Sequence, residues 1–234
     1  IIFITHKLEE VLELADRITV MRDGRVAGVV PAKGTTKEEL ARMMVGRDVL
    51  LRVSKEESTP GEPVLEVEGL SAVGRKGTLV LDDVSFEVRS GEVLGIAGVQ
   101  GNGQTELVEV ITGLRTASAG TVAVCGIETT RLSPRQVRDL GVAHIPEDRQ
   151  ERGLVLGFTI AENLVLGKHH RPPFSRRGLM ALDEVRGHAE RLIDEHDLRP
   201  ADPDVDAGHL SGGNQQKVIV AREFDGGPAL LVAS

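Results

Sequence analysis

Residues 93–105 read VLGIAGVQGNGQT, a short apolar run followed by a glycine-rich loop, and a helical pattern continues from there to Ile111. A short apolar run bounded by glycine is typical of a strand buried in the middle of a sheet. A buried strand that passes through a loop into a helix is typical of α/β proteins. The stretch therefore predicts a central strand over residues 93–97, with an α/β sheet around it.

The loop over residues 98–105 has the position and spacing of a phosphate-binding loop, G-x-x-x-x-G-K-[ST], with Gln104 in place of the lysine. Its glycines let successive backbone N–H groups point at one anion, beside the positive end of the next helix. Thr105 can offer a hydroxyl to Mg²⁺, whereas Gln104 offers only a neutral amide, which predicts weak phosphate binding. A tight strand-to-helix turn without a ligand is the alternative. The candidate nucleotide-binding residues are Gly98, Gly101, Asn102, Gly103, Gln104 and Thr105.

A dinucleotide-binding loop is a second alternative, because three of the same glycines also form G-x-x-G-x-G. Glu128, near the end of the next strand region, could then bind the ribose. The short-chain reductases that use such a loop need a catalytic tyrosine, and the chain contains none. This argues strongly against the dinucleotide interpretation.

The residues before this stretch predict a small α/β region and then a break. An apolar run predicts a buried parallel strand at residues 1–5, although its sheet partners would have to come from outside the chain. A helix over residues 8–15 and a hairpin over 18–30, turning at Asp23-Gly24, follow. Thr36 and Glu39 form a capping-box pattern for a helix that Gly46 closes. Polar residues with Pro and Gly then mark a linker. The predicted domains are residues 1–47, a linker at 48–62, and residues 63–234.

Strand and helix patterns continue through the second region, which predicts an α/β sheet with a helical insertion. The expected strands are residues 64–68, 79–88, 142–145 and 230–233, and the expected helices are residues 159–166 and 182–198.

The composition is that of an ordinary globular protein of 234 residues, 40% hydrophobic and 27% charged. A formal net charge of −8 argues against a basic face for nucleic acid. The lone Cys125 cannot form an internal disulfide, which fits a reducing compartment. No apolar run approaches the roughly 20 residues that a membrane-spanning helix needs. His169-His170 lacks the spacing and partners of a zinc site, and the basic run around it fits a solvated loop or a contact with a partner.

A second motif, LSGGNQQK at residues 210–217, is more specific. Ser211 can cap a helix that begins near Asn214, and Gly212-Gly213 lets backbone N–H groups approach an anion. A Ser-Gly-Gly loop before an ordinary helix is the plain alternative. The motif resembles the signature of ATP-binding-cassette (ABC) transporters, in the form used by ATPase subunits of sugar-type importers.

The resemblance covers the whole chain. Residues 2–11, IFITHKLEEV, resemble the switch-histidine segment that ends a first cassette, and residues 44–47, MVGR, resemble that cassette's exit. Residues 141–149, GVAHIPEDR, resemble the Q-loop region of a second cassette, with Glu147 where most cassettes have glutamine. Segments at 153–156 and 173–178 are most similar to the nucleoside-importing branch. The resemblance implies a P-loop NTPase cassette of α/β class, with a mixed sheet core, an antiparallel β edge and a helical signature subdomain, preceded by the C-terminal part of another cassette.

The family pattern also implies roles for single residues. His6 would be catalytic, orienting the attacking water at the γ-phosphate in a composite site that the second cassette's signature completes. The signature residues are Ser211, Gly212, Gly213, Asn214 and Gln215. Glu147 would lie in the loop that couples the nucleotide to the membrane partner. Ser234 falls where the Walker B aspartate would be, and residues 71–78 contain no aromatic residue for adenine, so the second site is expected to be degenerate.

We therefore expect a fragment of the ATPase subunit of a sugar or nucleoside importer, truncated at Walker B, peripheral on the cytoplasmic face of the membrane. ATP and Mg²⁺ are the implied cofactors. The implied partners are membrane-embedded permease subunits, indirectly a solute-binding protein, and the other cassette, with no nucleic acid. The full protein would hydrolyse ATP, and the fragment alone would be inactive. A non-catalytic interaction or dimerisation module is the alternative, and a soluble ABC ATPase of DNA repair or translation is a weaker one.

Overall fold

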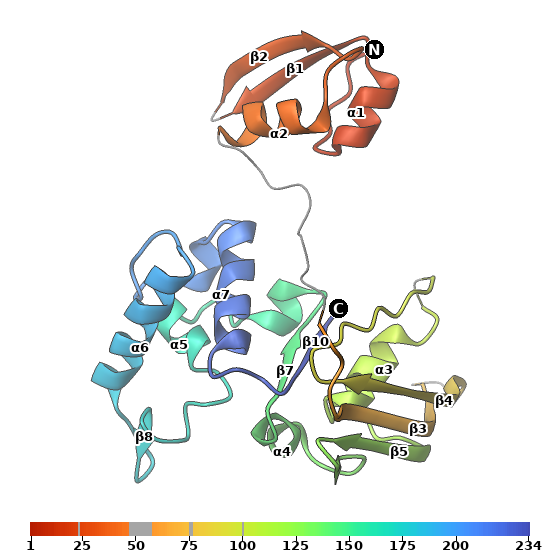
Figure 1. Cartoon of the computed structure of the whole chain (residues 1–234). Helices are drawn as coiled ribbons and strands as arrows, with labels where there is room; N and C mark the ends of the chain where they lie inside the picture. The colour runs from red at the N-terminus through yellow and green to blue at the C-terminus, as the bar shows by residue number, and fades with distance from the viewer. Residues whose placement is uncertain (23, 47–57, 75–76, 100) are drawn as a thin grey trace. The chain divides into compact units, whose positions relative to one another are not determined.

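A computed structural model of the chain describes residues 1–22, 24–46, 58–74, 77–99 and 101–234 (Figure 1). The chain divides into two compact units, Ile1–Glu57 and Ser58–Ser234. Most of the predicted linker, residues 48–57, lies outside the described residues. None of the helices in the described ranges combines the length and the apolar character needed to cross a membrane.

The first unit is a hairpin packed against two helices. Strands β1 (Arg17–Arg22) and β2 (Arg25–Pro31) are antiparallel, and helices α1 (Leu8–Leu14) and α2 (Lys37–Val45) accompany them. The predicted caps of α2 are confirmed at Thr36, whose hydroxyl accepts from the Glu39 N–H, and at Gly46, which ends the helix at φ 81°, but among the described residues the Glu39 side chain makes no return bond to complete the capping box. The predicted hairpin is confirmed as well, although Asp23 of its turn lies outside the described residues. Its small apolar core contains Ile18, Val20, Ala32 and Leu40.

The strand predicted at residues 1–5 is wrong. These residues have no regular structure, and Ile1, Ile2 and Ile4 are almost fully exposed. An apolar run becomes a strand only when a neighbouring strand takes up its backbone N–H and C=O groups. In the described part of the first unit, β1 and β2 pair with each other and leave this run without a partner.

The sheet part of the second unit, as we name it, contains two sheets and two helices. The four-stranded antiparallel sheet has the order β4-β3-β5-β6, and β7 pairs in parallel with β10. The elements are β3 (Pro63–Val73), β4 (Leu79–Arg89), α3 (Gln104–Ile111), β5 (Ala119–Val124), β6 (Ile127–Glu128), α4 (Pro134–Asp139), β7 (Val142–Ile145) and β10 (Leu230–Ala233). One apolar core joins both sheets to α3 and α4, and includes Leu70, Leu107, Val137, Val142 and Leu230.

The helical part of the second unit is inserted between β7 and β10 and has its own apolar core, which includes Ile160, Leu164, Leu192 and Ile219. Figure 1 shows β7 and β10 between the two parts, with the four-stranded sheet on one side and α5, α6 and α7 on the other. The predicted helices are confirmed, with shorter bounds. The elements are a π-helical turn (Arg149–Gly153), α5 (Ile160–Leu164), β8 (Ser175–Arg176), β9 (Leu179–Met180), α6 (Leu182–Glu195), a 3₁₀ turn (Ala207–His209) and α7 (Gly212–Phe224).

The central strand predicted at residues 93–97 is also wrong, although the helix after the loop is confirmed. Residues 93–99 are irregular and exposed, with 79% of Val93 and 53% of Ile96 accessible to solvent. A strand in the middle of a sheet needs hydrogen-bonding neighbours on both sides. Within the described residues β7 and β10 pair only with each other, so the apolar run has no ladder to join.

Candidate nucleotide site and signature helix

An open cleft of about 1360 Å³ lies beside the glycine-rich loop in the second unit. Residues of the loop, of α3, of the segment from His144 to Asp148 and of β10 line it. The cleft therefore lies where a buried strand edge, a helix N-terminus and a polar turn meet. Of the predicted site residues, it brings together Gly98, Gly101, Gln104, Thr105 and Glu147.

The loop turns through two glycines in the left-handed region, Gly101 at φ 90° and Gly103 at φ 97°. The Asn102 N–H donates to the Val99 carbonyl at 3.1 Å, and Gly103 serves as the N-cap of α3. A Cβ on Gly103 would lie 2.6 Å from the Val80 carbonyl oxygen of β4, whereas one on Gly101 would meet nothing within 4 Å. Gly103 is thus required for both its backbone conformation and its packing.

Gln104 bonds within the loop itself. Its Nε2 donates to the Val99 carbonyl at 3.2 Å and lies so close to Gly98 that a Cβ there would meet it at 2.1 Å. Thr105, one residue later, is exposed in the cleft. The loop therefore presents the Thr105 hydroxyl to the cleft, while the Gln104 side chain is folded back onto the loop.

Charged residues that the sequence did not single out line the same cleft. Burial works to raise the pKa of Glu109, but hydrogen bonds from Arg115 and Arg152 outweigh it, so the pKa lies below the ordinary value. Glu109 Oε2 lies 2.8 Å from Arg115 Nη2, and Glu109 Oε1 lies 3.0 Å from Arg152 Nη1. Backbone hydrogen bonds from Glu151 and Gln150 likewise lower the pKa of Asp148. The Arg152–Glu109 ion pair therefore joins the π-helical turn to α3 within the lining of the cleft.

His144 of β7 and the residues of β10 also line the cleft. The Ser234 N–H donates to the Ile145 carbonyl at 3.0 Å, which continues the parallel pairing and puts a hydroxyl side chain in the lining. His144 lines the cleft as well, and its buried Nε2 has no hydrogen-bond partner among the described residues. Burial lowers the pKa of His144, so its ring is neutral at neutral pH.

The signature segment begins α7, as the sequence predicted, but the helix starts two residues earlier, at Gly212. Ser211 is its N-cap and accepts from the Asn214 N–H at 3.4 Å and from the Asn214 Nδ2 at 3.0 Å. Gln215 points inward and is only 2% exposed. Its Oε1 accepts from Gln150 at 3.2 Å, and its Nε2 donates to the Ala207 carbonyl at 3.1 Å.

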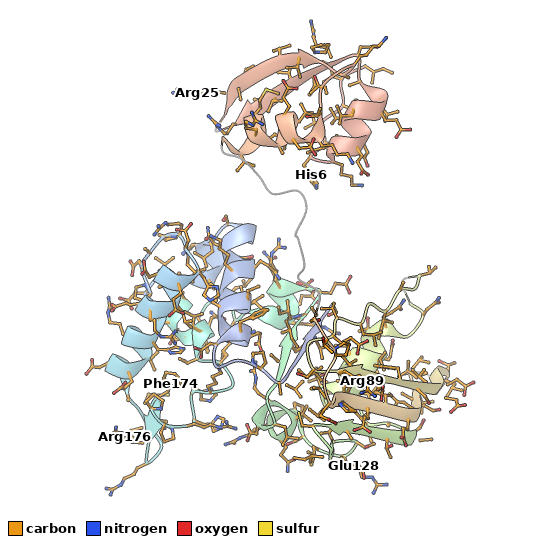
Figure 2. All side chains as sticks on the ribbon, in the orientation of Figure 1. His6, Arg25, Arg89, Glu128, Phe174 and Arg176 are labelled. Carbon is orange, nitrogen blue, oxygen red and sulfur yellow. The ribbon has the colours of Figure 1, made fainter. Side chains whose placement is uncertain are left out.

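Several predicted site residues lie outside the cleft lining. Asn102 and Gly103 belong to the loop but do not line the cleft, and neither do the five signature residues. His6 is exposed before α1 in the first unit (Figure 2). Glu128, the ribose-binding candidate of the dinucleotide interpretation, is exposed in β6 and is not part of the cleft either.

Comparison with known sequences identifies a family and several relatives. The sequence model of the family described as "ABC transporter" matches residues 81–233. The nucleoside import ATP-binding protein NupA of Lactococcus lactis subsp. cremoris is 44% identical over all of this chain and 46% of its own length. The glucose import ATP-binding protein TsgD13 of Haloferax volcanii is 47% identical over all of this chain and 43% of its own length. The ribose import ATP-binding protein RbsA 2 of Rubrobacter xylanophilus is 40% identical over 99% of this chain and 43% of its own length. The chain spans a little under half the length of each of these relatives.

Solved structures agree on the fold. The dimeric structure of MJ0796, a bacterial ABC transporter cassette, superposes with a TM-score of 0.59 at 23% identity, covering 72% of each chain. A dimeric post-hydrolysis state of MJ0796 bound to ADP and Pi gives a TM-score of 0.58 with the same identity and coverage. The predicted P-loop NTPase cassette fold is confirmed. With a family match over most of the chain and this fold, the protein belongs to the ABC transporter family.

Proposed function

We propose that this chain is part of the ATP-binding subunit of an ABC importer for a sugar or a nucleoside, and that its own nucleotide site is degenerate. The solute class rests on the names of the relatives, which are importers of nucleosides, glucose and ribose. We further propose that residues 1–47 are the C-terminal part of one cassette, residues 48–62 a linker and residues 63–234 a second cassette. In this scheme His6 is the switch histidine of the first cassette.

The observation that supports a degenerate site most directly is the Gln104 side chain. Its neutral amide takes the place of a lysine and donates to the Val99 carbonyl at 3.2 Å. A phosphate in the cleft would gain only neutral hydrogen bonds from Gln104, and the amide would first have to leave Val99. Because charge-assisted hydrogen bonds are about twice as strong as neutral ones, nucleotide binding here is weak.

Thr105 is the residue that would contact Mg²⁺. Mg²⁺ in nucleotide sites is held by one or two protein oxygens together with phosphate oxygens and water. The exposed Thr105 hydroxyl in the cleft fits this set. The hydroxyl of Ser234, which also lines the cleft, takes the place of a Walker B carboxylate, which makes the ion's binding weaker than in a complete site.

Calorimetric titration of the chain with Mg-ATP tests the proposal. We expect a dissociation constant in the millimolar range or weaker, and about tenfold tighter binding by Gln104→Lys, because a charged donor adds about 1.4 kcal/mol over a neutral one. Gln104→Met is the uncharged control, and Thr116→Lys adds the same charge at an exposed site outside the cleft lining. Micromolar binding by the unchanged chain, or no gain with Gln104→Lys, would overturn the degenerate site.

A second candidate is a non-catalytic interaction module, which is favoured by the hydrogen bond from Gln104 Nε2 to the Val99 carbonyl of its own loop. Because Gln104 satisfies its own amide within the loop, the cleft can keep its shape without a nucleotide. In this function the second unit serves to dimerise with another cassette and to bind membrane-embedded permease subunits, and through them indirectly a solute-binding protein, at the cytoplasmic face of the membrane. Glu147, at the cleft, would be part of the coupling loop to those subunits.

Co-purification separates the two candidates. If the chain is a module only, it should bind detergent-solubilised permease subunits equally well with and without Mg-ATP. If the weak nucleotide site is used, saturating Mg-ATP should change that binding at least severalfold, and the Gln104→Lys variant should show the change at lower ATP concentration.

A further inference from the structure

A buried cluster of charges joins the sheet part to the helical part of the second unit. Among the described residues, Arg222 and Glu223 are the charged residues whose whole side chains are buried, at 6% and 4% exposure. Both lie near the C-terminal end of α7, the helix whose N-cap is Ser211. The Glu223 carboxylate is therefore at one end of α7, and the signature is at the other.

Glu223 contacts both parts of the unit. On the sheet side, Arg138 of α4 donates to its two carboxylate oxygens at 2.6 and 2.5 Å, and the His144 main-chain N–H of β7 donates to Oε2 at 3.2 Å. On the helical side, Arg222 Nε donates to Oε1 at 2.7 Å. Burial works to raise the pKa of Glu223, but the two arginines outweigh it and lower the pKa, so the carboxylate is charged at neutral pH.

The cluster continues into α5 and the loop after it. Arg222 also reaches the Asn163 carbonyl at 3.5 Å, and Arg138 reaches the Leu166 carbonyl at 3.4 Å. Asn163 is fully buried, and its side chain bonds the main chain of Val155, Phe158 and Thr159 at 2.9–3.2 Å. The carboxylate thus joins the strand that lines the cleft to the frame of the helical part.

The hydrogen bonds of the cluster fix the angle between the sheet part and the helical part more tightly than apolar packing does. The sheet part and the helical part have separate apolar cores. Contacts between apolar side chains are non-directional, so two such bodies can slide against each other. The Glu223 carboxylate accepts from Arg138 Nη2 through both of its oxygens and from the His144 main-chain N–H, and charge-assisted hydrogen bonds of this kind fix direction as well as distance.

We propose that Glu223 is a positioning residue that fixes α7 against β7, and so sets where the Ser211-capped end of α7 lies relative to the cleft. Because α7 is a continuous helix of 13 residues, Ser211 lies about 18 Å from Glu223 along the helix axis. A small rotation of α7 about Glu223 therefore displaces Ser211. The proposal concerns the conformation of the chain itself and holds whether or not the cleft binds ATP.

The chain offers a matched control in Asp225, two residues along. Asp225 also binds two cations, Lys168 at 2.8 Å and Arg191 at 2.9 Å, and lies 3.5 Å from the neutral ring of His188. All three belong to the helical part, so the loss of this carboxylate removes comparable ion pairs without touching the sheet part.

Distance measurement by electron paramagnetic resonance tests the proposal without any nucleotide. One spin label goes on the native, exposed Cys125, between β5 and β6, and the other on Asp194→Cys, exposed in α6. We expect the interspin distance distribution to become at least twice as broad, or to shift, in Glu223→Gln, and to stay unchanged in Asp225→Asn. Arg138→Lys, which keeps the charge but cannot contact Glu223 and the Leu166 carbonyl through two separate nitrogens, should give an intermediate width.

Two results would overturn the proposal. One is a distance distribution of equal width in Glu223→Gln and in the parent. The other is equal broadening of the distribution in Asp225→Asn, because that would mean a general loss of stability. If Glu223→Gln fails to fold, Arg138→Lys carries the same test: an unchanged distribution in that variant would overturn it. If the calorimetric titration showed no binding of Mg-ATP, the distance distributions would still be interpreted in the same way.

Discussion

Gln215 and Gln104 show how residues of the same type have different uses in the second unit. Gln215 is buried and bonds Gln150 and the Ala207 carbonyl, so it fixes the start of α7 to the turns beside it. Gln104 is half-buried at the cleft and bonds the carbonyl of its own loop. The signature glutamine is therefore a structural residue in this conformation, and the loop glutamine is the one that a ligand could displace.

The two left-handed glycines of the loop should respond differently to alanine. Any side chain at φ near 90° costs about 1–2 kcal/mol, which applies to both Gly101 and Gly103. Only Gly103→Ala also drives a Cβ to 2.6 Å from the Val80 carbonyl. We expect Gly103→Ala to lower the free energy of unfolding, measured in urea, at least twice as much as Gly101→Ala. Equal losses would mean that the contact with β4 is relieved by movement of the loop.

At the scale of elements, α7 depends on its N-cap. Ser211 accepts from the Asn214 N–H and also from the Asn214 side chain, so its hydroxyl holds the first turn. Ser211→Ala should cost about 1 kcal/mol of stability, and Ser211→Thr should recover most of it. Thermal unfolding followed by circular dichroism measures both. A neutral Ser211→Ala would indicate that the packing of Val218 and Ile219 alone fixes this helix.

The elements also show which features a sequence can predict. Both ends of α2 were predictable because a cap needs only residues within a few positions, Thr36 with Glu39 and then Gly46. The apolar runs at 1–5 and 93–97 look like those of β7 and β10, yet only the latter two become strands, because each provides the other's hydrogen bonds. Strand formation depends on a partner far away in the sequence, which a local pattern does not contain.

The candidate site, like the elements, was predicted only in part. The spacing of glycines identified the loop, and Gln104, Thr105 and Glu147 do line one cleft. The cations and carboxylates around them were missed, because their partners lie 43 to 85 residues away, as in Arg152 with Glu109 and Arg138 with Glu223. An Arg-Glu pair within the otherwise apolar run VIVAREF was the one available signal for the second of these.

At the scale of the whole molecule, two partly buried histidines, each with a buried Nε2, predict how stability depends on pH. Burial lowers the pKa of both His144 and His188, with nearby Glu223 and Asp225 opposing it only in part. The unfolded chain takes up these protons near pH 6.5, the ordinary value, while the folded protein stays neutral to lower pH. The stability is therefore complete above about pH 6.5 and is lost as the pH falls through that value toward the folded pKa.

Differential scanning calorimetry from pH 8 to pH 5.5 checks this dependence. The melting temperature of the second unit should fall across the range, and the fall should be smaller in a His144→Gln/His188→Gln double variant. Glu109, Glu223 and Asp225, whose pKa values are lowered, add a second loss at more acidic pH, as their carboxylates become protonated. A melting temperature that rises or stays constant between pH 8 and pH 5.5 would contradict the assignment of neutral, partly buried histidines.

The whole chain should not turn over ATP. Among the residues that the structure describes, the lining of the cleft includes no lysine, and in the proposed scheme Ser234 takes the place of the carboxylate that would hold Mg²⁺. Phosphoryl transfer depends on cations that neutralise the developing charge and on a positioned water, and within the described part of the chain the cleft is lined by two cations, Arg89 and Arg152. We expect phosphate release from Mg-ATP at the rate of a buffer blank, and the same rate from His6→Ala and Gln104→Met variants prepared in parallel. Since a contaminating ATPase would be unaffected by either substitution, a rate above the blank that drops with His6→Ala would establish that the chain hydrolyses ATP and would overturn this prediction.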